Sequence, residues 1–480
     1  MKARLPITLA VSLATLFSSA ALVVACTEED GATREPEGAP DAGPDVVANL
    51  PEASPPPEAG PDARPDPRPP FDPADEEVVC AGHAGACAVE LVAGRNHFCA
   101  RMSDGTVRCW GEDKAGAIGA PPDGGVPPAV RTIDGLSGVT QISAAGRTTC
   151  ARLDDGTAKC WGDNGSAQLG ALEDGGASAD ALPHPIPSPV AIDDPIARID
   201  VGQRAACAVL ASGKVYCWGD NLQQQIARPS SGLRGPVEID QGGLALTKLS
   251  LGAQTSFGLT ADGKVASWGA VSGGWVTPSG SQGLLAGRPA SISPDATPVA
   301  IDPLHDVTSF AVSDTLELDE EGRLGAQLPP PPPAGGVRHA HACAIAAGEV
   351  YCWGRSDYGA LCTGLLDAER FPAHAPIRSS KAWPQRIAVG DEFTCVRMTD
   401  GGIQCCGADH RGRLGSGFSP LFVPVEAFKG HAVQVATSHR AVCALVQGGS
   451  VECWGSNQYG ELGQGSLDQD AHPTPAKVAF

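Results

Sequence analysis

From about residue 89 to its end, the chain alternates short apolar runs with turn-forming residues. In the stretch Phe98 to Gly111, an apolar run is followed by Asp104-Gly105 and then by a second apolar run that ends in Trp-Gly. This pattern predicts a β-hairpin, because Gly supplies the positive φ that the turn requires. An upstream apolar run, such as residues 89–94, predicts a strand before the hairpin. Recurring Pro-Val pairs predict a further strand that starts at Pro, where a missing N–H does least harm; the pairs are Pro189-Val190, Pro236-Val237, Pro298-Val299 and Pro424-Val425.

The same phrase recurs seven times along the chain, mostly at intervals of about fifty residues. The copies are Ala93 to Gly111, Cys150 to Gly162, Cys207 to Gly219, Phe257 to Gly269, Cys343 to Gly354, Cys395 to Gly407 and Cys443 to Gly455. Four strands per copy at this spacing are typical of propeller blades. We therefore predict an all-β chain whose residues 80–480 form a seven-bladed β-propeller with four-stranded blades.

A second signature follows the Trp-Gly pairs in several copies. It is seen at Asn164 to Gly170, Tyr358 to Leu361, Arg411 to Gly415 and Tyr459 to Gly463. The combination of G-x-x-H/T, an Asp-Gly turn, Trp-Gly and x-G-x-L-G resembles the repeat of the regulator of chromosome condensation family. The resemblance covers roughly residues 89–480 and implies a seven-bladed β-propeller. Copy four departs from the pattern at Phe257 and Ser267, and it has no clear G-x-L-G.

An insertion at about residues 314–338 precedes copy five and contains the run Pro329 to Pro333. Residues 316–324 within it have the pattern of a degenerate hairpin, so an eighth blade is an alternative. Only 27 residues separate Leu316 from Cys343, which is too few for four strands. We therefore expect seven blades with an inserted hairpin or loop.

The first 25 residues have the features of an export signal. Lys2 and Arg4 form a positive n-region, and the apolar stretch 9–24 is short for a membrane span. The stretch ends in residues 22–26, Leu-Val-Val-Ala-Cys, which resembles a bacterial lipobox and predicts lipidation of Cys26. An ordinary signal peptide that happens to contain Cys is the alternative. Thr27 is not the Asp that marks inner-membrane retention, so we expect an outer-membrane or cell-surface lipoprotein, anchored to the membrane through lipid alone.

Residues 26–79 are predicted to form a disordered, acidic, Pro-rich tether. Residues 27–79 contain 13 Pro, 15 Asp or Glu and only 3 Arg, with too little apolar surface to offset the entropy of ordering. The whole chain carries a net charge of −21, and more than half of this acidity lies in the tether. So acidic a chain argues against nucleic-acid binding, which needs clustered Lys and Arg.

The chain contains 17 cysteines, a number typical of oxidising compartments unless the thiols bind metal. In six copies one Cys opens the hairpin and another stands just before Trp-Gly, so the two lie opposite each other on the paired strands. Both are missing from copy four. Cross-strand disulfides are therefore predicted to join Cys99 with Cys109, Cys150 with Cys160, Cys207 with Cys217, Cys343 with Cys352, Cys395 with Cys405 and Cys443 with Cys453.

Four further cysteines are predicted to form two more disulfides. Cys80 and Cys87 flank a Gly-rich loop that they could close, although nearby His83 and His97 leave zinc as an alternative. Cys362 replaces a Gly in copy five and Cys406 replaces the Trp of copy six, so we pair these two exceptions. Cys26 would then be the single unpaired cysteine.

No catalytic, metal or cofactor motif stands out in the sequence. The repeated position of His97 and His341 favours packing or a strand-edge hydrogen bond, and the Trp of each Trp-Gly pair favours a wedge between blades. The Asp residues of the Asp-Gly turns are interpreted as turn formers, with calcium binding as the alternative; they are Asp104, Asp155, Asp262 and Asp400. His410, Arg411 and Arg413 form a local basic cluster, for which a solvated loop is the simpler interpretation.

The functional candidates are therefore the variable loops, at residues 120–130, 171–188, 270–295 and 314–338. We expect a monomeric, non-enzymatic module without cofactor or metal, whose loops on one face bind an envelope or extracellular protein or glycan. The family resemblance implies nucleotide exchange on a small GTPase as one alternative, and an enzyme-inhibiting propeller as another. An enzyme with a site in the central channel is a weaker one.

Overall fold

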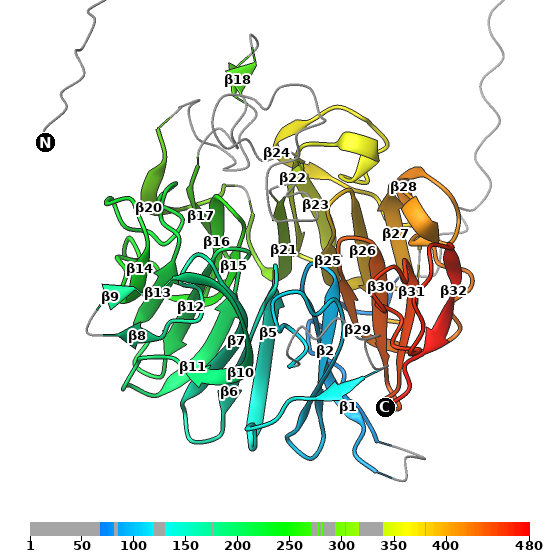
Figure 1. Ribbon diagram of the computed structural model, residues 1–480. Coiled ribbons are helices and arrows are strands. Elements are labelled where there is room, and N and C mark those ends of the chain that lie inside the picture. The colour runs from blue at the N-terminus through cyan, green and yellow to red at the C-terminus, as the bar shows by residue number, and fades with distance from the viewer. Residues whose placement is uncertain are drawn as a thin grey trace, which may run out of the picture. The chain divides into compact units, whose positions relative to one another are not determined.

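The computed structural model describes residues 68–80, 85–119, 130–173, 176–177, 179–270, 276–277, 280–281, 293–302, 304–315, 339–379 and 381–480. These residues form seven four-stranded antiparallel sheets arranged as blades around a central axis (Figure 1). The predicted fold class, an all-β seven-bladed propeller, is confirmed. The predicted signal peptide, Cys26 and residues 26–67 of the predicted tether lie outside the described residues.

Within each blade the strands follow chain order from the axis outward. The first strands are β1 (Ala88–Ala93), β5 (Val139–Ala145), β11 (Ile196–Val201), β15 (Leu246–Leu251), β21 (Val307–Thr315), β25 (Pro384–Val389) and β29 (Ala432–Thr437). The second strands are β2 (His97–Met102), β6 (Thr148–Leu153), β12 (Ala205–Leu210), β16 (Thr255–Thr260), β22 (His339–Ala346), β26 (Phe393–Met398) and β30 (Ala441–Val446).

The third strands end in the Trp-Gly pairs or their equivalents, and the fourth form the outer edges. The third strands are β3 (Val107–Gly111), β7 (Ala158–Asn164), β13 (Val215–Gly219), β17 (Val265–Gly269), β23 (Glu349–Gly354), β27 (Ile403–Gly407) and β31 (Val451–Gly455). The fourth strands are β4 (Arg131–Thr132), β10 (Asp180–Pro189), β14 (Arg234–Glu238), β20 (Asp295–Ala300), β24 (Glu369–His374), β28 (Ser419–Pro424) and β32 (His472–Lys477).

Short elements occupy some of the loops. They are the paired strands β8 (Leu172–Glu173) with β9 (Gly176–Ala177) and β18 (Val276–Thr277) with β19 (Gly280–Ser281), and the 3-10 turns η1 (Asp357–Gly359) and η2 (His410–Gly412). None of the helical segments in the described ranges is long and apolar enough to cross a membrane.

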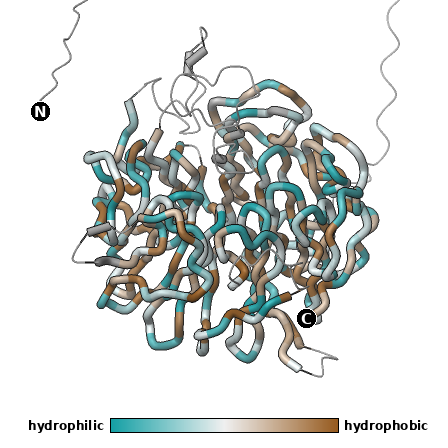
Figure 2. The backbone as a smooth tube through the Cα atoms, in the orientation of Figure 1, coloured by the Kyte–Doolittle hydropathy of each residue, from teal (hydrophilic) through white to brown (hydrophobic). Residues whose placement is uncertain are grey.

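Each blade is built from one continuous segment, so no sheet combines strands from the two ends of the chain. The ring closes where blade 1 meets blade 7. There the Leu91 amide donates to Gln434 Oε1 at 2.8 Å, and the His439 amide donates to the Arg95 carbonyl at 2.7 Å. Apolar residues are spread over all the blades (Figure 2), and the core is a series of clusters shared between neighbouring blades.

The Trp side chains are wedges between blades, as the sequence predicts. All six are at most 1% exposed. In five of them the indole Nε1 donates to a backbone carbonyl of the x-G-x-L-G loop in the preceding blade, at 2.8–2.9 Å. The bonds join Trp110 to Glu461, Trp161 to Ala117, Trp218 to Gln168, Trp268 to Gln225 and Trp454 to Arg413.

The Gly after each Trp is needed for two reasons. In Gly111, φ is +107°, a region that side chains rarely enter. A Cβ there would also lie 2.4 Å from the carbonyl oxygen of Asn96. The Trp-Gly pair therefore fixes both the wedge and the close approach of the backbone beside it.

The fourth strand does not start at Pro, and that part of the prediction is wrong. Pro236 and Pro298 lie inside their strands, and Pro189 and Pro424 end theirs. Because the fourth strand forms the blade's outer edge, a Pro whose nitrogen faces solvent loses no sheet hydrogen bond at any point along it.

The predicted tether is too long at its C-terminal end. Residues 68–79, here called the N-terminal strap, lie against blades 5 to 7. Trp383 Nε1 donates to the carbonyl of Pro69 at 2.7 Å, and Phe71 packs edge-on against the Trp383 ring. Glu76 pairs with Arg397 and His431. Composition suggested disorder because the strap has little apolar surface of its own; its partners supply that surface and the opposite charges.

The predicted insertion at 314–338 is placed by its two ends. It leaves from the end of β21 and returns at the start of β22, so it connects the first two strands of blade 5. Residues 316–338, including the candidate degenerate hairpin, lie outside the described residues. The part of the chain that the structure describes contains seven blades.

Candidate binding face and central cavity

The strand order gives the propeller two different faces. In each blade, the connection between strands 1 and 2 lies at the same end as the loop between strands 3 and 4, because neighbouring strands are antiparallel. We call this end the loop face. The Asp-Gly turns between strands 2 and 3 lie at the other end, which we call the turn face.

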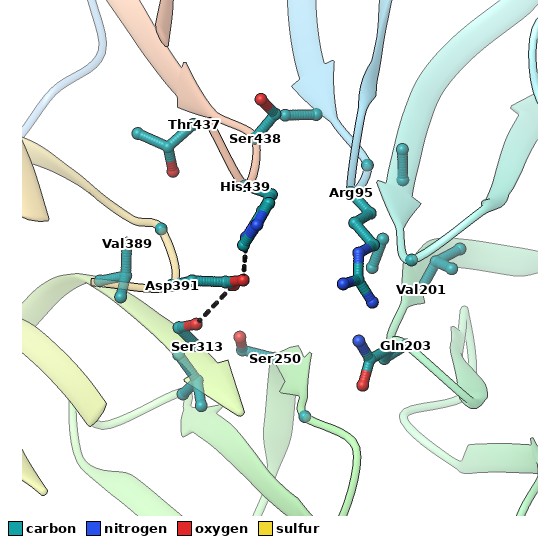
Figure 3. Close-up of a pocket in the computed structure, with 18 of the residues that line it drawn as sticks. Arg95, Val201, Gln203, Ser250, Ser313, Val389, Asp391, Thr437, Ser438 and His439 are labelled. Atoms are coloured by element: carbon teal, nitrogen blue, oxygen red, sulfur yellow. Dashed lines mark hydrogen bonds and ion pairs between the residues drawn. The ribbon is translucent and has the colours of Figure 1, made fainter. Parts of the chain in front are cut away.

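A central cavity of about 190 Å³ opens among the inner strands near the loop face (Figure 3). All seven blades contribute to its lining through the ends of their first strands and the turns that follow. Much of the lining is small, including Ala93, Ala144, Gly146, Gly252 and Gly390. The inner strands converge here, and these small side chains leave the space open.

Charged and polar side chains enter this cavity from opposite walls. Figure 3 shows Arg95 and Gln203 on one wall and Asp391 on the other. Ser313 Oγ donates to Asp391 Oδ1 at 3.4 Å, and His439 Nδ1 bonds to Asp391 Oδ2. Because a carboxylate accepts hydrogen bonds, Asp391 holds His439 with its proton on Nδ1.

In three blades the lining residue is followed directly by an arginine. Arg147 pairs with Glu112 at 3.4 Å, and Arg204 pairs with Asp220 at 3.0 Å. Arg440 bonds to Gln458 Oε1 at 3.1 Å. Two of these three arginines are therefore paired with acidic side chains.

The loop face of blades 5 to 7 carries exposed apolar side chains, here called the loop-face patch. Its members are Tyr358, Leu365, Leu366, Phe371, Phe418 and Leu467. Leu366 is 61% exposed and Phe418 is 54% exposed. Neighbouring loops are joined: Tyr358 contacts the His410 ring, and Thr363 forms a β-bridge with Leu421 of the next blade. These contacts join the loops of blades 5 and 6, which carry most of the patch.

Sixteen cysteines form eight disulfides, and the pairs are those that the sequence predicts. Six of these disulfides staple the hairpins between the second and third strands of their blades, with Cα atoms 4.0–4.1 Å apart. They join Cys99 with Cys109, Cys150 with Cys160, Cys207 with Cys217, Cys343 with Cys352, Cys395 with Cys405 and Cys443 with Cys453. In each pair the two residues are direct partners in the antiparallel register, as at Cys150 and Cys160.

The seventh disulfide lies before the first blade. Cys80 pairs with Cys87, so the zinc alternative has no free thiols there. His83 lies outside the described residues, and His97 lies in a blade interface. In the described part of the chain, no group of three or more His, Cys, Asp or Glu residues is placed so that it could hold a metal ion.

The eighth disulfide, between Cys362 and Cys406, crosses from blade 5 to blade 6. Cys406 replaces the wedge Trp. Cys362 lies at the loop position that is Gly in most other blades, where a Cβ on Gly170 would approach the Trp218 indole to 2.7 Å. Beside an indole this position holds Gly or, at Ala227, only a methyl group, whereas the smaller Cys406 leaves room for the Cys362 side chain.

His97 and His341 make hydrogen bonds inside blade interfaces, as expected. His97 Nε2 bonds to Thr149 Oγ1 at 2.9 Å, and His341 Nε2 bonds to Thr394 Oγ1 at 3.0 Å. Both are 1% exposed. Burial lowers the pKa of His97 to about 4, so this ring is neutral near pH 7.

The remaining sequence candidates are structural. Thr106 donates its amide and hydroxyl to Asp104, and Thr157 does the same to Asp155, so these carboxylates shape turns. Arg413 of the basic cluster is 1% exposed and pairs with Glu392 at 3.1 Å. It is therefore neither a free basic patch nor a solvated loop residue. Of the variable loops, 171–188 is described in large part, whereas most of the other three lies outside the described residues.

Sequence reasoning missed the central cavity. Arg95, Gln203, Asp391 and His439 occupy one repeat position, two residues after the end of the first strand, where blade 2 has Gly146. Each is unremarkable alone. The signal was available in the alignment of the repeats, because this position is basic in one blade, acidic in another and uncharged in others.

The comparisons with known proteins agree with this architecture. The family model described as "Regulator of chromosome condensation (RCC1) repeat" matches residues 347–397, and a second model with the same description matches residues 88–117, 139–168 and 196–225. Yeast RCC1 (Prp20), in a crystal structure with Kap60, superposes with a TM-score of 0.60 at 16% identity, over 82% of this chain and 85% of that one. Human WBSCR16 superposes with a TM-score of 0.57 at 18% identity, over 77% and 94%.

The chain therefore carries RCC1 repeats and folds as an RCC1-like seven-bladed β-propeller. Among curated proteins, it is 27% identical to the human E3 ubiquitin-protein ligase HERC2 over 204 residues, which is 41% of this chain and 4% of that protein. It is 29% identical to the Arabidopsis thaliana mitochondrial RCC1 domain-containing protein RUG3 over 135 residues, which is 27% of this chain and 30% of that protein. The chain thus spans less than a third of each of these curated relatives.

Proposed function

We propose that this protein is an exported, lipid-anchored binding module without enzymatic activity, and that its loop-face patch binds a protein of the cell envelope or the extracellular space. The loop-face patch is the observation that carries the proposal. Exposed large apolar side chains gathered in one region are typical of protein interaction sites, whereas scattered ones are ordinary. Leu366, Phe371 and Phe418 would supply the buried centre of such an interface.

Export is supported by the cysteines. Disulfides form and persist in oxidising compartments, and the eight disulfides use every cysteine except Cys26. Cys26 stands at the end of the lipobox-like segment and is the residue that would carry the lipid. Outer-membrane or surface display then follows from Thr27, and the propeller needs no membrane contact of its own.

The binding proposal is tested by capture from envelope extracts with the propeller as bait. Leu366→Glu and Phe418→Glu should abolish capture of the partner. The matched controls are Leu182→Glu and Ile186→Glu, which alter exposed apolar residues on blade 2 and should leave capture unchanged. Equal capture by all four variants would contradict the patch. Recovery of a small GTPase alone would favour the exchange-factor alternative, and recovery of a glycan would replace the protein partner.

The anchor is tested separately by labelling cells with a lipid precursor. The wild type should incorporate the label, and Cys26→Ala should not. Unchanged labelling of the variant would overturn the lipoprotein assignment without affecting the binding proposal.

A further inference from the structure

We propose that the central cavity binds a small zwitterion, namely a free α-amino acid, with Arg95 facing its carboxylate and Asp391 facing its ammonium group. This site is distinct from the loop-face patch and does not depend on the protein partner. The proposal uses three properties of the cavity: the arrangement of charge, the size and the variability of the charged positions among the repeats.

The two walls carry opposite charges. The planar guanidinium of Arg95 has a geometry that matches a carboxylate, and the Gln203 amide lies beside it (Figure 3). Across the cavity, Asp391 is held by Ser313 and His439. A carboxylate has about four lone-pair sites, so Asp391 can accept a hydrogen bond from an ammonium group in addition to the bonds that it already makes. Asp391 would repel a simple anion, and Arg95 would repel a simple cation. The two residues together therefore favour a ligand that carries both charges.

The volume fits a ligand of this kind. About 190 Å³ corresponds to roughly six water molecules at about 30 Å³ each, which suits a compound of a few heavy atoms. Between the charged walls, Val201, Leu251 and Val389 offer apolar surface. A small aliphatic side chain would pack there, whereas a folded protein segment would not enter.

The four-stranded sheets do not require a charge at this repeat position. The repeat position of Arg95 and Asp391 is Gly146 in blade 2 and Ala253 in blade 4, and those blades form the same sheets. A residue needed for packing would be expected in every blade, as the Trp wedges nearly are. Arg and Asp instead occur at this position in one blade each, as Arg95 and Asp391, and these two lie on facing walls of one cavity.

The test is calorimetric titration of the purified protein with three matched probes. L-valine carries both charges, 3-methylbutanoate lacks the ammonium group, and 2-methylpropan-1-amine lacks the carboxylate. We expect saturable binding of L-valine and at least about tenfold weaker binding of the other two, a difference of about 1.4 kcal/mol or more. Equal affinity for 3-methylbutanoate, or no binding of L-valine up to about 10 mM (a bound of about −2.7 kcal/mol), would overturn the proposal.

Variants locate the site. Arg95→Met and Asp391→Asn should each weaken L-valine binding at least about tenfold. Ser250→Leu fills the cavity without removing either charge and should do the same, while exposed Arg234→Met is the matched control and should bind normally. Thermal melts confirm that each variant is folded. Full binding by Arg95→Met or Ser250→Leu would overturn the site. Leu366→Glu should retain L-valine binding, so failure of this proposal and failure of the partner proposal are distinguishable.

Discussion

Cys362 and Cys406 form a disulfide at the blade 5–blade 6 boundary, where five other boundaries have a tryptophan indole bonded to a loop carbonyl. Both partners differ from the repeat pattern together. The Gly that makes room for the indole has become Cys362, and the Trp has become Cys406. A covalent bond thus replaces a wedge and its hydrogen bond.

This exchange should be reversible by mutation. Cys362→Ala with Cys406→Ala removes a bond that closes a loop of about 45 residues, so we expect a loss of up to about 4 kcal/mol in the free energy of unfolding. Cys362→Gly with Cys406→Trp restores the pattern of the other boundaries and should recover part of that loss. Equilibrium denaturation under non-reducing conditions measures both. The idea fails if the Gly/Trp variant is no more stable than the Ala/Ala variant.

His97 should make the protein sensitive to acid. Its pKa is lowered to about 4 in the folded state, against about 6.5 in an unfolded chain. The unfolded state therefore binds an extra proton between these values, and stability falls by up to about 3 kcal/mol as the pH drops from 6.5 to 4. Phe393 and Val442 occupy the positions of His97 and Thr149 at another boundary. The double variant His97→Phe, Thr149→Val should therefore lose less stability over this pH range than the wild type, and parallel curves would contradict the assignment.

Glu461 should have the opposite pH dependence. This side chain is fully buried beside the ring closure, and burial raises its pKa to about 7. The stability associated with its neutral form is present below about pH 4.5 and is lost as the pH rises through 7. Gln occupies the same loop position at 168 and 225. Glu461→Gln should therefore stabilise the protein by up to about 3 kcal/mol at pH 8 and very little at pH 4.5.

Glu426→Gln, at an exposed site, is the control for this measurement. It should change stability little at either pH. A Glu461→Gln variant that gains equally at pH 4.5 and pH 8 would show that the effect is not one of protonation.

The N-terminal strap should stabilise the propeller through Glu76. Arg397 is buried, and Glu76 is the acidic partner of its guanidinium. Glu76→Gln removes the ion-pair partner of that charge, so we expect a loss of about 2 kcal/mol, since Glu76 is itself partly exposed. Glu77→Gln, at an exposed neighbouring position, should have almost no effect. Chemical denaturation of the two variants decides whether the strap is docked, because equal stability would mean that it is not.

The repeat pattern was enough to predict the blades, because each hairpin carries its own turn, its own pair of cysteines and its own Trp-Gly. Cys99 and Cys109 meet across one hairpin, so their pairing follows from local register. Cys362 and Cys406 were paired only by their shared departure from the pattern. The strap was missed because Glu76 has partners more than 300 residues away. The cavity was missed because its charges come from different blades.

By itself, the sequence determined the all-β class, the number of blades and the six hairpin disulfides, since these depend on spacing and short-range register repeated many times. Only the tertiary structure decided which side chains meet at the axis. Arg95 and Asp391 lie on facing walls because the ring brings blade 1 and blade 6 around a common centre. That closure depends on packing summed over all seven blade boundaries, and no single repeat encodes it.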